Sequence, residues 1–117
     1  MRYSRQEVLI GRENQNLLCK KTVCIIGLGA LGSNSSNLLA RTGVNLVLID
    51  NDQVELSNLQ RQGIYTEEDI GKFKSGVAYD YLKKVNSKIK IKCECVKLNK
   101  ENTNLIKCDL VLDCTDN

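Results

Sequence analysis

The segment VCIIGLGALG, residues 23–32, decides the fold of this chain. Its first four residues are apolar, as in a strand that is buried on both faces of a parallel sheet. Its last six follow the pattern Gly-x-Gly-x-x-Gly, which predicts a phosphate-binding turn when it joins a strand to a helix. In that turn Gly27 permits the tight bend, Gly29 lets the backbone approach a phosphate, and Gly32 lets the helix pack closely on the strand.

A second apolar run, LVLI at residues 46–49, ends in Asp50, about twenty residues after the turn, as the dinucleotide-binding fingerprint requires. An acid at the end of this strand is placed to hydrogen-bond ribose hydroxyls. A glycine-rich turn can also occur without a ligand, but the strand, helix and acid together favour nucleotide binding.

Working outward, apolar runs and helical periodicities alternate along the chain. The alternation predicts an α/β fold, a Rossmann-like doubly wound and mostly parallel sheet with helices on both faces and strand order 3-2-1-4. The strands are expected at residues 22–27, 45–50, 89–96 and 110–114, and the helices at 13–19, 31–42, 74–85 and 101–107.

Four strands are about half of such a domain, so we expect a single domain over residues 1–117 that is truncated at its C-terminus, or a sheet that another chain completes. Two finer expectations concern helices. Ser4 and Glu7 fit a capping box that starts an N-terminal helix. Leu31, Leu38 and Leu39 fall on one stripe of the helix 31–42, which predicts its buried face.

Composition narrows the classes of function. The 117 residues carry a net charge of +3, with 42% hydrophobic residues and no long apolar run, so we expect neither a membrane protein nor a nucleic-acid-binding one. Late lysines such as Lys97 are interpreted as a solvated face. The six cysteines are interpreted as buried structural thiols of a cytoplasmic protein, with Cys93 and Cys95 on one strand face. Without histidine, Ser-His and Cys-His catalysis are excluded.

A polar stretch follows Asp50, where ligands sit in this fold class. Arg61 can grip phosphate oxygens with two donors, Lys74 supplies a point charge at the start of the next helix, and Asp116 can hold Mg²⁺ through an oxygen. Two cations beyond the ribose acid suit a triphosphate whose outer groups must leave. The alternative, plain surface charge, remains open from these residues alone.

At these residues the sequence resembles the ThiF/MoeB/HesA family of adenylating enzymes, relatives of the ubiquitin-activating enzyme. The matching pieces are RYSRQ, GLGALG, DNDQVELSNLQRQ, IGKFK and CTDN, which span the whole chain in the family's order. The resemblance implies a homodimer that binds ATP and Mg²⁺, adenylates the C-terminal carboxylate of a ubiquitin-like or sulfur-carrier protein, and releases pyrophosphate. RYSRQ and LSNLQRQ favour the sulfur-carrier activators over the relatives that modify tRNA.

The resemblance also implies roles for single residues. Arg5 would reach the nucleotide of the other subunit, Asp116 would bind magnesium, and Arg61 and Lys74 would act with them in catalysis. The implied nucleotide-binding residues are Gly27, Gly29, Ala30, Gly32, Asp50, Asp52, Ser57, Asn58, Arg61, Lys74 and Asn117.

Three departures and two competing functions accompany this resemblance. Phe73 stands where the family usually has proline, and Ala30 where glycine is frequent; family members also continue well past residue 117. One alternative is a non-catalytic nucleotide-binding fragment. The other is an NAD-dependent oxidoreductase, which would use the glycine turn and Asp50 but has no need for residues 58–61.

Overall fold

The computed structural model describes residues 1–115. Its four strands form one parallel sheet in the order β3-β2-β1-β4, as expected. The strands are β1 (Thr22–Ile26), β2 (Asn45–Ile49), β3 (Ile91–Glu94) and β4 (Leu110–Asp113). The α-helices are α1 (Ser4–Ile10), α2 (Arg12–Leu18), α3 (Ala30–Thr42) and α4 (Lys74–Val85), and three short 3-10 helices are η1 (Leu56–Asn58), η2 (Glu67–Asp69) and η3 (Thr103–Leu105).

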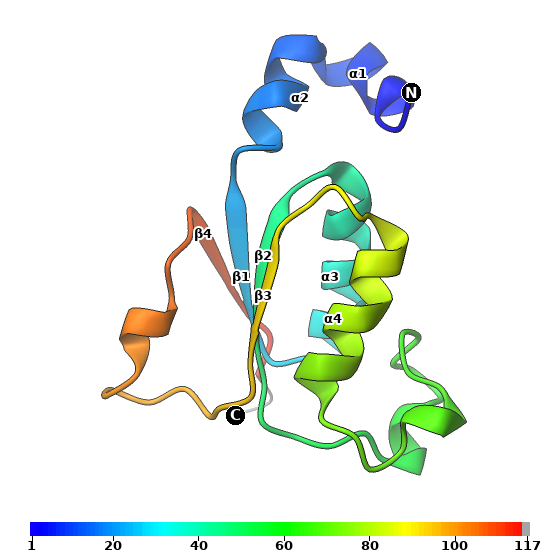
Figure 1. Cartoon of the computed structure of the whole chain (residues 1–117), viewed down its shortest axis with the longest axis vertical. Coiled ribbons are helices and arrows are strands. Elements are labelled where there is room, and N and C mark those ends of the chain that lie inside the picture. The colour runs from blue at the N-terminus through cyan, green and yellow to red at the C-terminus, as the bar shows by residue number, and fades with distance from the viewer. Residues whose placement is uncertain (116–117) are drawn as a thin grey trace.

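The two faces of the sheet are covered differently (Figure 1). Helices α3 and α4 lie side by side on one face, where they enclose the larger apolar core. The other face is covered by the chain between β3 and β4, which packs on Cys24, Val47 and Ile49. In that chain we expected a helix at 101–107, but only the single turn of η3 forms, so this face has no α-helix among the described residues.

The inner face of α3 differs from the predicted one. Leu31 and Leu38 are 65% and 66% exposed, and only Leu39 packs on the core. The reason is Gly32, because a Cβ there would lie 1.7 Å from the carbonyl oxygen of Gly27. A helix held this close to the strand has room only for small side chains, and its buried residues are Gly32, Ser33, Ser36 and Ala40.

The N-terminal helices lie beyond the amino ends of the strands (Figure 1). The expected capping box is wrong, since Tyr3 is the N-cap residue and the Ser4 hydroxyl donates to the carbonyl of Met1. Side chains tie α1 to the rest of the fold, as Gln6 donates to the carbonyl of Thr42 (2.8 Å) and Asn86 donates to the Tyr3 hydroxyl (2.9 Å). Among residues 1–115, every helix is too short or too polar to traverse a lipid bilayer.

The cysteines are free thiols, and most are at least partly buried. Cys95 is the exception, because β3 ends at Glu94 and does not carry the expected alternation further. Burial raises the pKa of Cys24 to about 11, and the neighbouring Cys108 adds to the effect. Burial also raises the pKa of Cys93 and Cys114. Thiols held protonated in this way are poor nucleophiles, which agrees with a structural role.

Candidate functional site: a pocket at the carboxyl edge of the sheet

A pocket of about 690 Å³ opens where the strands end. Its walls come from all four strand ends and from the loop that joins β2 to α4. Parallel strands present their carboxyl ends at one edge of the sheet, which is where ligands bind in open α/β folds. We call residues 27–32 the phosphate turn and residues 51–74 the cation loop.

The phosphate turn is built by close backbone approach. Gly27 has φ 93°, and a Cβ on it would lie 2.9 Å from the carbonyl oxygen of Cys114. Gly29 lines the pocket and is the N-cap residue of α3, which has no side-chain cap within the described part of the chain. The first N–H groups of a helix of this length, without a side-chain acceptor, form a site for an anion.

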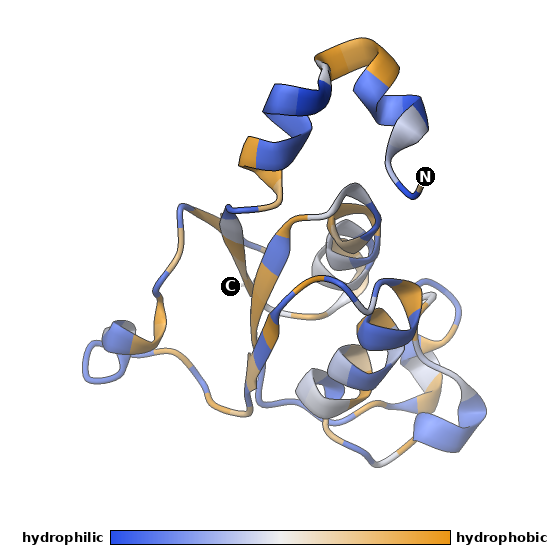
Figure 2. Cartoon of the chain, turned by 45° about the horizontal axis from the view of Figure 1, so that its top comes forward, coloured by the Kyte–Doolittle hydropathy of each residue, from blue (hydrophilic) through white to orange (hydrophobic). Residues whose placement is uncertain are grey.

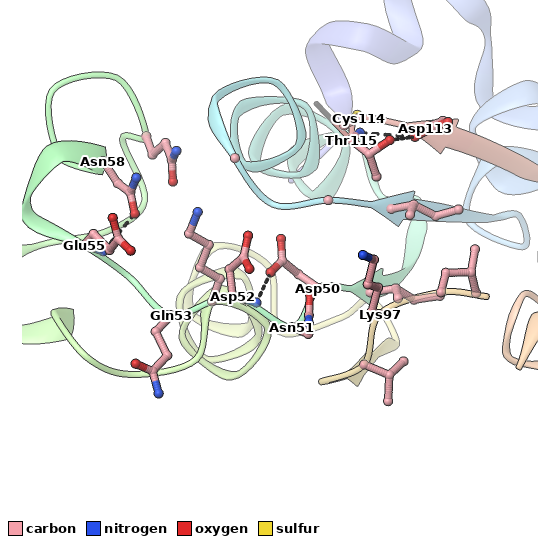
Figure 3. A pocket seen from close by; sticks show the side chains of 18 of the residues that line it. Asp50, Asn51, Asp52, Gln53, Glu55, Asn58, Lys97, Asp113, Cys114 and Thr115 are labelled. Atoms are coloured by element: carbon pink, nitrogen blue, oxygen red, sulfur yellow. Dashed lines mark hydrogen bonds between the residues drawn. The ribbon is translucent and has the colours of Figure 1, made fainter. Parts of the chain in front are cut away.

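Asp50 joins the phosphate turn to the end of β2. Its Oδ2 accepts a hydrogen bond from the backbone N–H of Leu28 (2.7 Å), and its Oδ1 accepts one from the N–H of Asp52 (2.6 Å). The side chain is mostly buried yet lines the pocket, with Asp52 beside it (Figure 3). A carboxylate retains further lone pairs, so this bracing leaves Asp50 able to accept from ribose hydroxyls.

The two ends of the cation loop are joined by backbone hydrogen bonds, which position the backbone of Lys74. The backbone N–H of Val54 donates to the carbonyl oxygen of Lys72 (2.8 Å), and the backbone N–H of Lys74 donates to the carbonyl oxygen of Asp52 (2.9 Å). Lys74, which begins α4, is only 6% exposed and lines the pocket. Phe73, just before it, has φ −71°, the angle that a proline would impose, so its backbone matches the proline that the resemblance implies at this position.

Asn58 and Arg61 of the cation loop also line the pocket. Asn58, at the end of η1, is buried, and its Oδ1 accepts from the N–H of Glu55 (2.8 Å). Arg61 is exposed, and its Nη1 donates to the carbonyl of Ser57 (2.9 Å). The guanidinium keeps four further N–H donors, so this bond leaves it able to bind an anion.

The structure thus brings most of the predicted site residues to one pocket. Those that line it are Gly27, Gly29, Asp50, Asp52, Asn58, Arg61 and Lys74. Ala30, Gly32 and Ser57 lie next to lining residues without lining it themselves. Arg5 is on α1, at the far edge of the sheet. Asp116 and Asn117 lie outside the described residues.

Sequence analysis missed the lining residues that follow β3 and those that end β4. Val96, Lys97 and Leu98 follow β3 after the intervening Cys95, so Lys97 belongs to the pocket as well as to a solvated face. Asp113 and Thr115 line the pocket at the end of β4 (Figure 3), and hydrogen bonds from Thr115 lower the pKa of Asp113. Their place in the sequence could have predicted these residues, because the residues that follow each parallel strand lie at this edge of the sheet.

Carboxylates of the pocket provide oxygen donors of the type that Mg²⁺ prefers. Residues 1–115 contain no group of three acidic, cysteine or histidine side chains that would form a metal site by itself. The Mg²⁺ ligand that the resemblance implies, Asp116, lies just beyond that range.

The parallel sheet, the glycine turn after β1 and the buried acid after β2 define a Rossmann-like domain, with a polar pocket at the carboxyl edge of its sheet. Comparison with known proteins gives the particular family, since the ThiF family model matches residues 3–117, and the chain belongs to the ThiF family. Similar curated proteins from Escherichia coli strain K12 are the sulfur carrier protein ThiS adenylyltransferase (45% identical) and molybdopterin-synthase adenylyltransferase (44% identical). Each match covers 100% of this chain and 49% of the relative, so the chain spans about half the length of both.

Solved structures agree on the fold. The E. coli tRNA N6-threonylcarbamoyladenosine dehydratase TcdA, in complex with ATP, superposes with a TM-score of 0.93 at 25% identity, over 99% of this chain and 49% of that one. The sequence relatives are thus sulfur-carrier adenylyltransferases, while the structural neighbour acts on tRNA. TcdA shares the α/β architecture described here over nearly the whole of this chain.

Proposed function

We propose that this protein uses ATP and Mg²⁺ to adenylate the C-terminal carboxylate of a ubiquitin-like sulfur-carrier protein, with release of pyrophosphate. The observation that carries the proposal is the single pocket lined by the phosphate turn, Asp50 and two cations, Arg61 and Lys74. Its relatives among sulfur-carrier adenylyltransferases supply the substrate class.

The proposed reaction needs positioning and charge neutralisation rather than a covalent catalyst. The carrier's carboxylate oxygen attacks the α-phosphorus, the bond from that phosphorus to the bridging oxygen breaks, and pyrophosphate leaves with the bonding electrons. Two anions must approach each other, so fixed cations stabilise the transition state most. Arg61 and Lys74 would hold the phosphate chain, and the N–H groups at the start of α3 would hold an oxygen of it. Mg²⁺, held by Asp116, would neutralise phosphate charge when bound.

We also propose that the protein works as a homodimer in which Arg5 serves the nucleotide of the second subunit. Arg5 is exposed on α1, at the edge of the sheet opposite its own pocket. Val8 and Leu9, also on α1, are 87% and 88% exposed. Figure 2 shows an apolar stretch where α1 meets α2. Exposed apolar residues grouped in this way favour burial against another protein surface.

The proposed function is tested by the exchange of labelled pyrophosphate into ATP in the presence of a sulfur-carrier protein. We expect carrier-dependent exchange that Arg61→Ala reduces by about 150-fold, or ~3 kcal/mol of transition-state stabilisation. Arg41→Ala is the matched control, because Arg41 is exposed in the last turn of α3 and bonds Asn37. ATP binding without exchange would support a non-catalytic nucleotide-binding protein, and tight NADH binding without ATP binding would support an oxidoreductase.

A further inference from the structure

Gln62 occupies a place at the phosphate turn to which sequence analysis gave no role. It is 3% exposed and lines the pocket beside Gly29. Its Nε2 lies 3.7 Å from the point where a Cβ on Gly29 would be. The amide nitrogen of Gln62 therefore adjoins the part of the turn that is left open for a phosphate.

The backbone around Gln62 is fixed. Its N–H donates to the carbonyl of Asn58 (2.9 Å), and its carbonyl accepts from the N–H of Tyr65 (3.2 Å). The Tyr65 hydroxyl donates in turn to the carbonyl of Leu28 inside the phosphate turn (2.7 Å). Burial raises the pKa of Tyr65, so the hydroxyl remains a donor. These bonds fix the backbone from which the buried Gln62 side chain extends beside the turn.

The oxygen of the same amide is buried and has no hydrogen-bond partner within the part of the protein that the structure describes. The Oε1 of Gln62 is the one buried side-chain nitrogen or oxygen without a hydrogen-bond partner among residues 1–115. Leaving a buried acceptor unpaired destabilises a fold, and native proteins seldom do so without a functional reason. An apolar side chain of the same size would fill this site without that loss, so the fold alone does not account for glutamine here.

We propose that Gln62 is a phosphate-binding residue whose Nε2 donates a hydrogen bond to a phosphate oxygen of the nucleotide on the turn. This proposal rests on the proposed function, because it requires a nucleotide in this pocket. Arg61 and Lys74 contribute positive charge. The neutral amide of Gln62, which lies beside Gly29, contributes a hydrogen bond that orients the phosphate. A hydrogen bond to a charged phosphate is among the stronger hydrogen bonds, and its loss weakens binding by about tenfold to a hundredfold.

The test compares Gln62→Met with Gln60→Met, because Gln60 is exposed and does not line the pocket. ATP and ADP binding are measured by calorimetry, adenosine binding by ligand-observed NMR, and the unliganded proteins by thermal melting. We expect Gln62→Met to weaken ATP and ADP at least tenfold and to leave adenosine binding unchanged. Its melting temperature should be equal to or higher than that of the wild type, because the unpaired acceptor is gone. Gln62→Glu should weaken ATP further, because it places a negative charge at the turn.

Opposite effects on stability and on phosphate binding distinguish a ligand contact from a structural role. Unchanged ATP affinity in Gln62→Met overturns the proposal. Equal losses for ATP and adenosine, with a lower melting temperature, also overturn it, because they show that the residue only supports the fold. A wild-type protein that binds no ATP overturns the proposed function itself, whereas normal wild-type binding with an unaffected variant overturns only the role of Gln62.

Discussion

The phosphate turn and the cation loop face the same pocket, but the turn is built from backbone and the loop from side chains. In the turn, hypothetical Cβ atoms at Gly27 and Gly32 would meet main-chain oxygens at 2.9 Å and 1.7 Å. In the loop, Lys74 and Arg61 reach the pocket on side chains, from a segment held by a short backbone pairing at its base. The difference teaches that substitutions at Gly27 and Gly32 act first on folding, whereas substitutions of the loop's cations act first on binding.

The largest effect on stability is expected at Gly32, where the turn has no room for a Cβ atom. Gly32→Ala should lower the free energy of unfolding by more than ~4 kcal/mol, because the new methyl group collides with main chain that cannot move freely. Gly76→Ala is the control, since Gly76 is an α4 residue with nothing within 4 Å of its missing Cβ. That change should raise the free energy of unfolding by ~0.5–1 kcal/mol. Chemical denaturation measures both, and a Gly32→Ala protein as stable as the wild type contradicts the close approach of α3.

In the cation loop the expected loss is in affinity. Lys74→Met should weaken ATP binding about a hundredfold, close to 2.7 kcal/mol, while stability holds or rises because a mostly buried charge is replaced by an apolar chain. Lys72→Met, two residues earlier, is exposed and outside the pocket, and it should bind ATP normally. Calorimetric titration measures the ATP affinity of both variants, and chemical denaturation measures their stability. Equal affinity in the two variants would show that the position of Lys74 has no bearing on the ligand.

Gly29→Ala tests a position of the phosphate turn at which binding, rather than stability, should change. A Cβ at this position would make only an ordinary 3.7 Å contact with Gln62, so stability should change by less than ~1 kcal/mol. The methyl group nevertheless occupies the approach to the helix N-terminus, so ATP binding should weaken about tenfold. If titration shows full affinity, the nucleotide does not approach the backbone at Gly29.

The smallest expected effect is at Tyr65, which connects the two regions through its bond to Leu28. Tyr65→Phe leaves a buried carbonyl unpaired and should lower the free energy of unfolding by ~1–2 kcal/mol, with a few-fold loss of ATP affinity. Tyr79→Phe is the control, because no hydrogen bond of the Tyr79 hydroxyl is formed with the described residues. Stability equal in the two variants would mean that the loop and the turn are not coupled through this bond.

The same contrast explains what the sequence could predict. The order β3-β2-β1-β4 and the start of α4 at Lys74 follow from buried runs and helical periodicity, and both are confirmed. Backbone constraints appear in a sequence as glycines, so the phosphate turn could be placed before the structure was known. The exposure of Leu31 and Leu38 could not, because it depends on how closely Gly32 allows α3 to approach the sheet.

Side-chain sites leave weaker signals. Polar residues of the cation loop fit a solvated surface as well as a pocket. The residues alone therefore left the role of Arg61 open, and the prediction that it binds phosphate came from the family resemblance. Gln62 and the segment after β3 that contains Lys97 were missed, because their proximity to the turn is created by tertiary packing. Their roles, like those of the predicted site residues, are predictions that binding experiments must test.

The most direct test of the central claim is a crystal structure of the protein with ATP and Mg²⁺. We predict that the triphosphate lies on the phosphate turn, that Lys74 and Arg61 contact its oxygens, and that the ribose hydroxyls meet Asp50. A nucleotide bound elsewhere, or Lys74 and Arg61 directed away from a nucleotide that does occupy the pocket, would contradict the account.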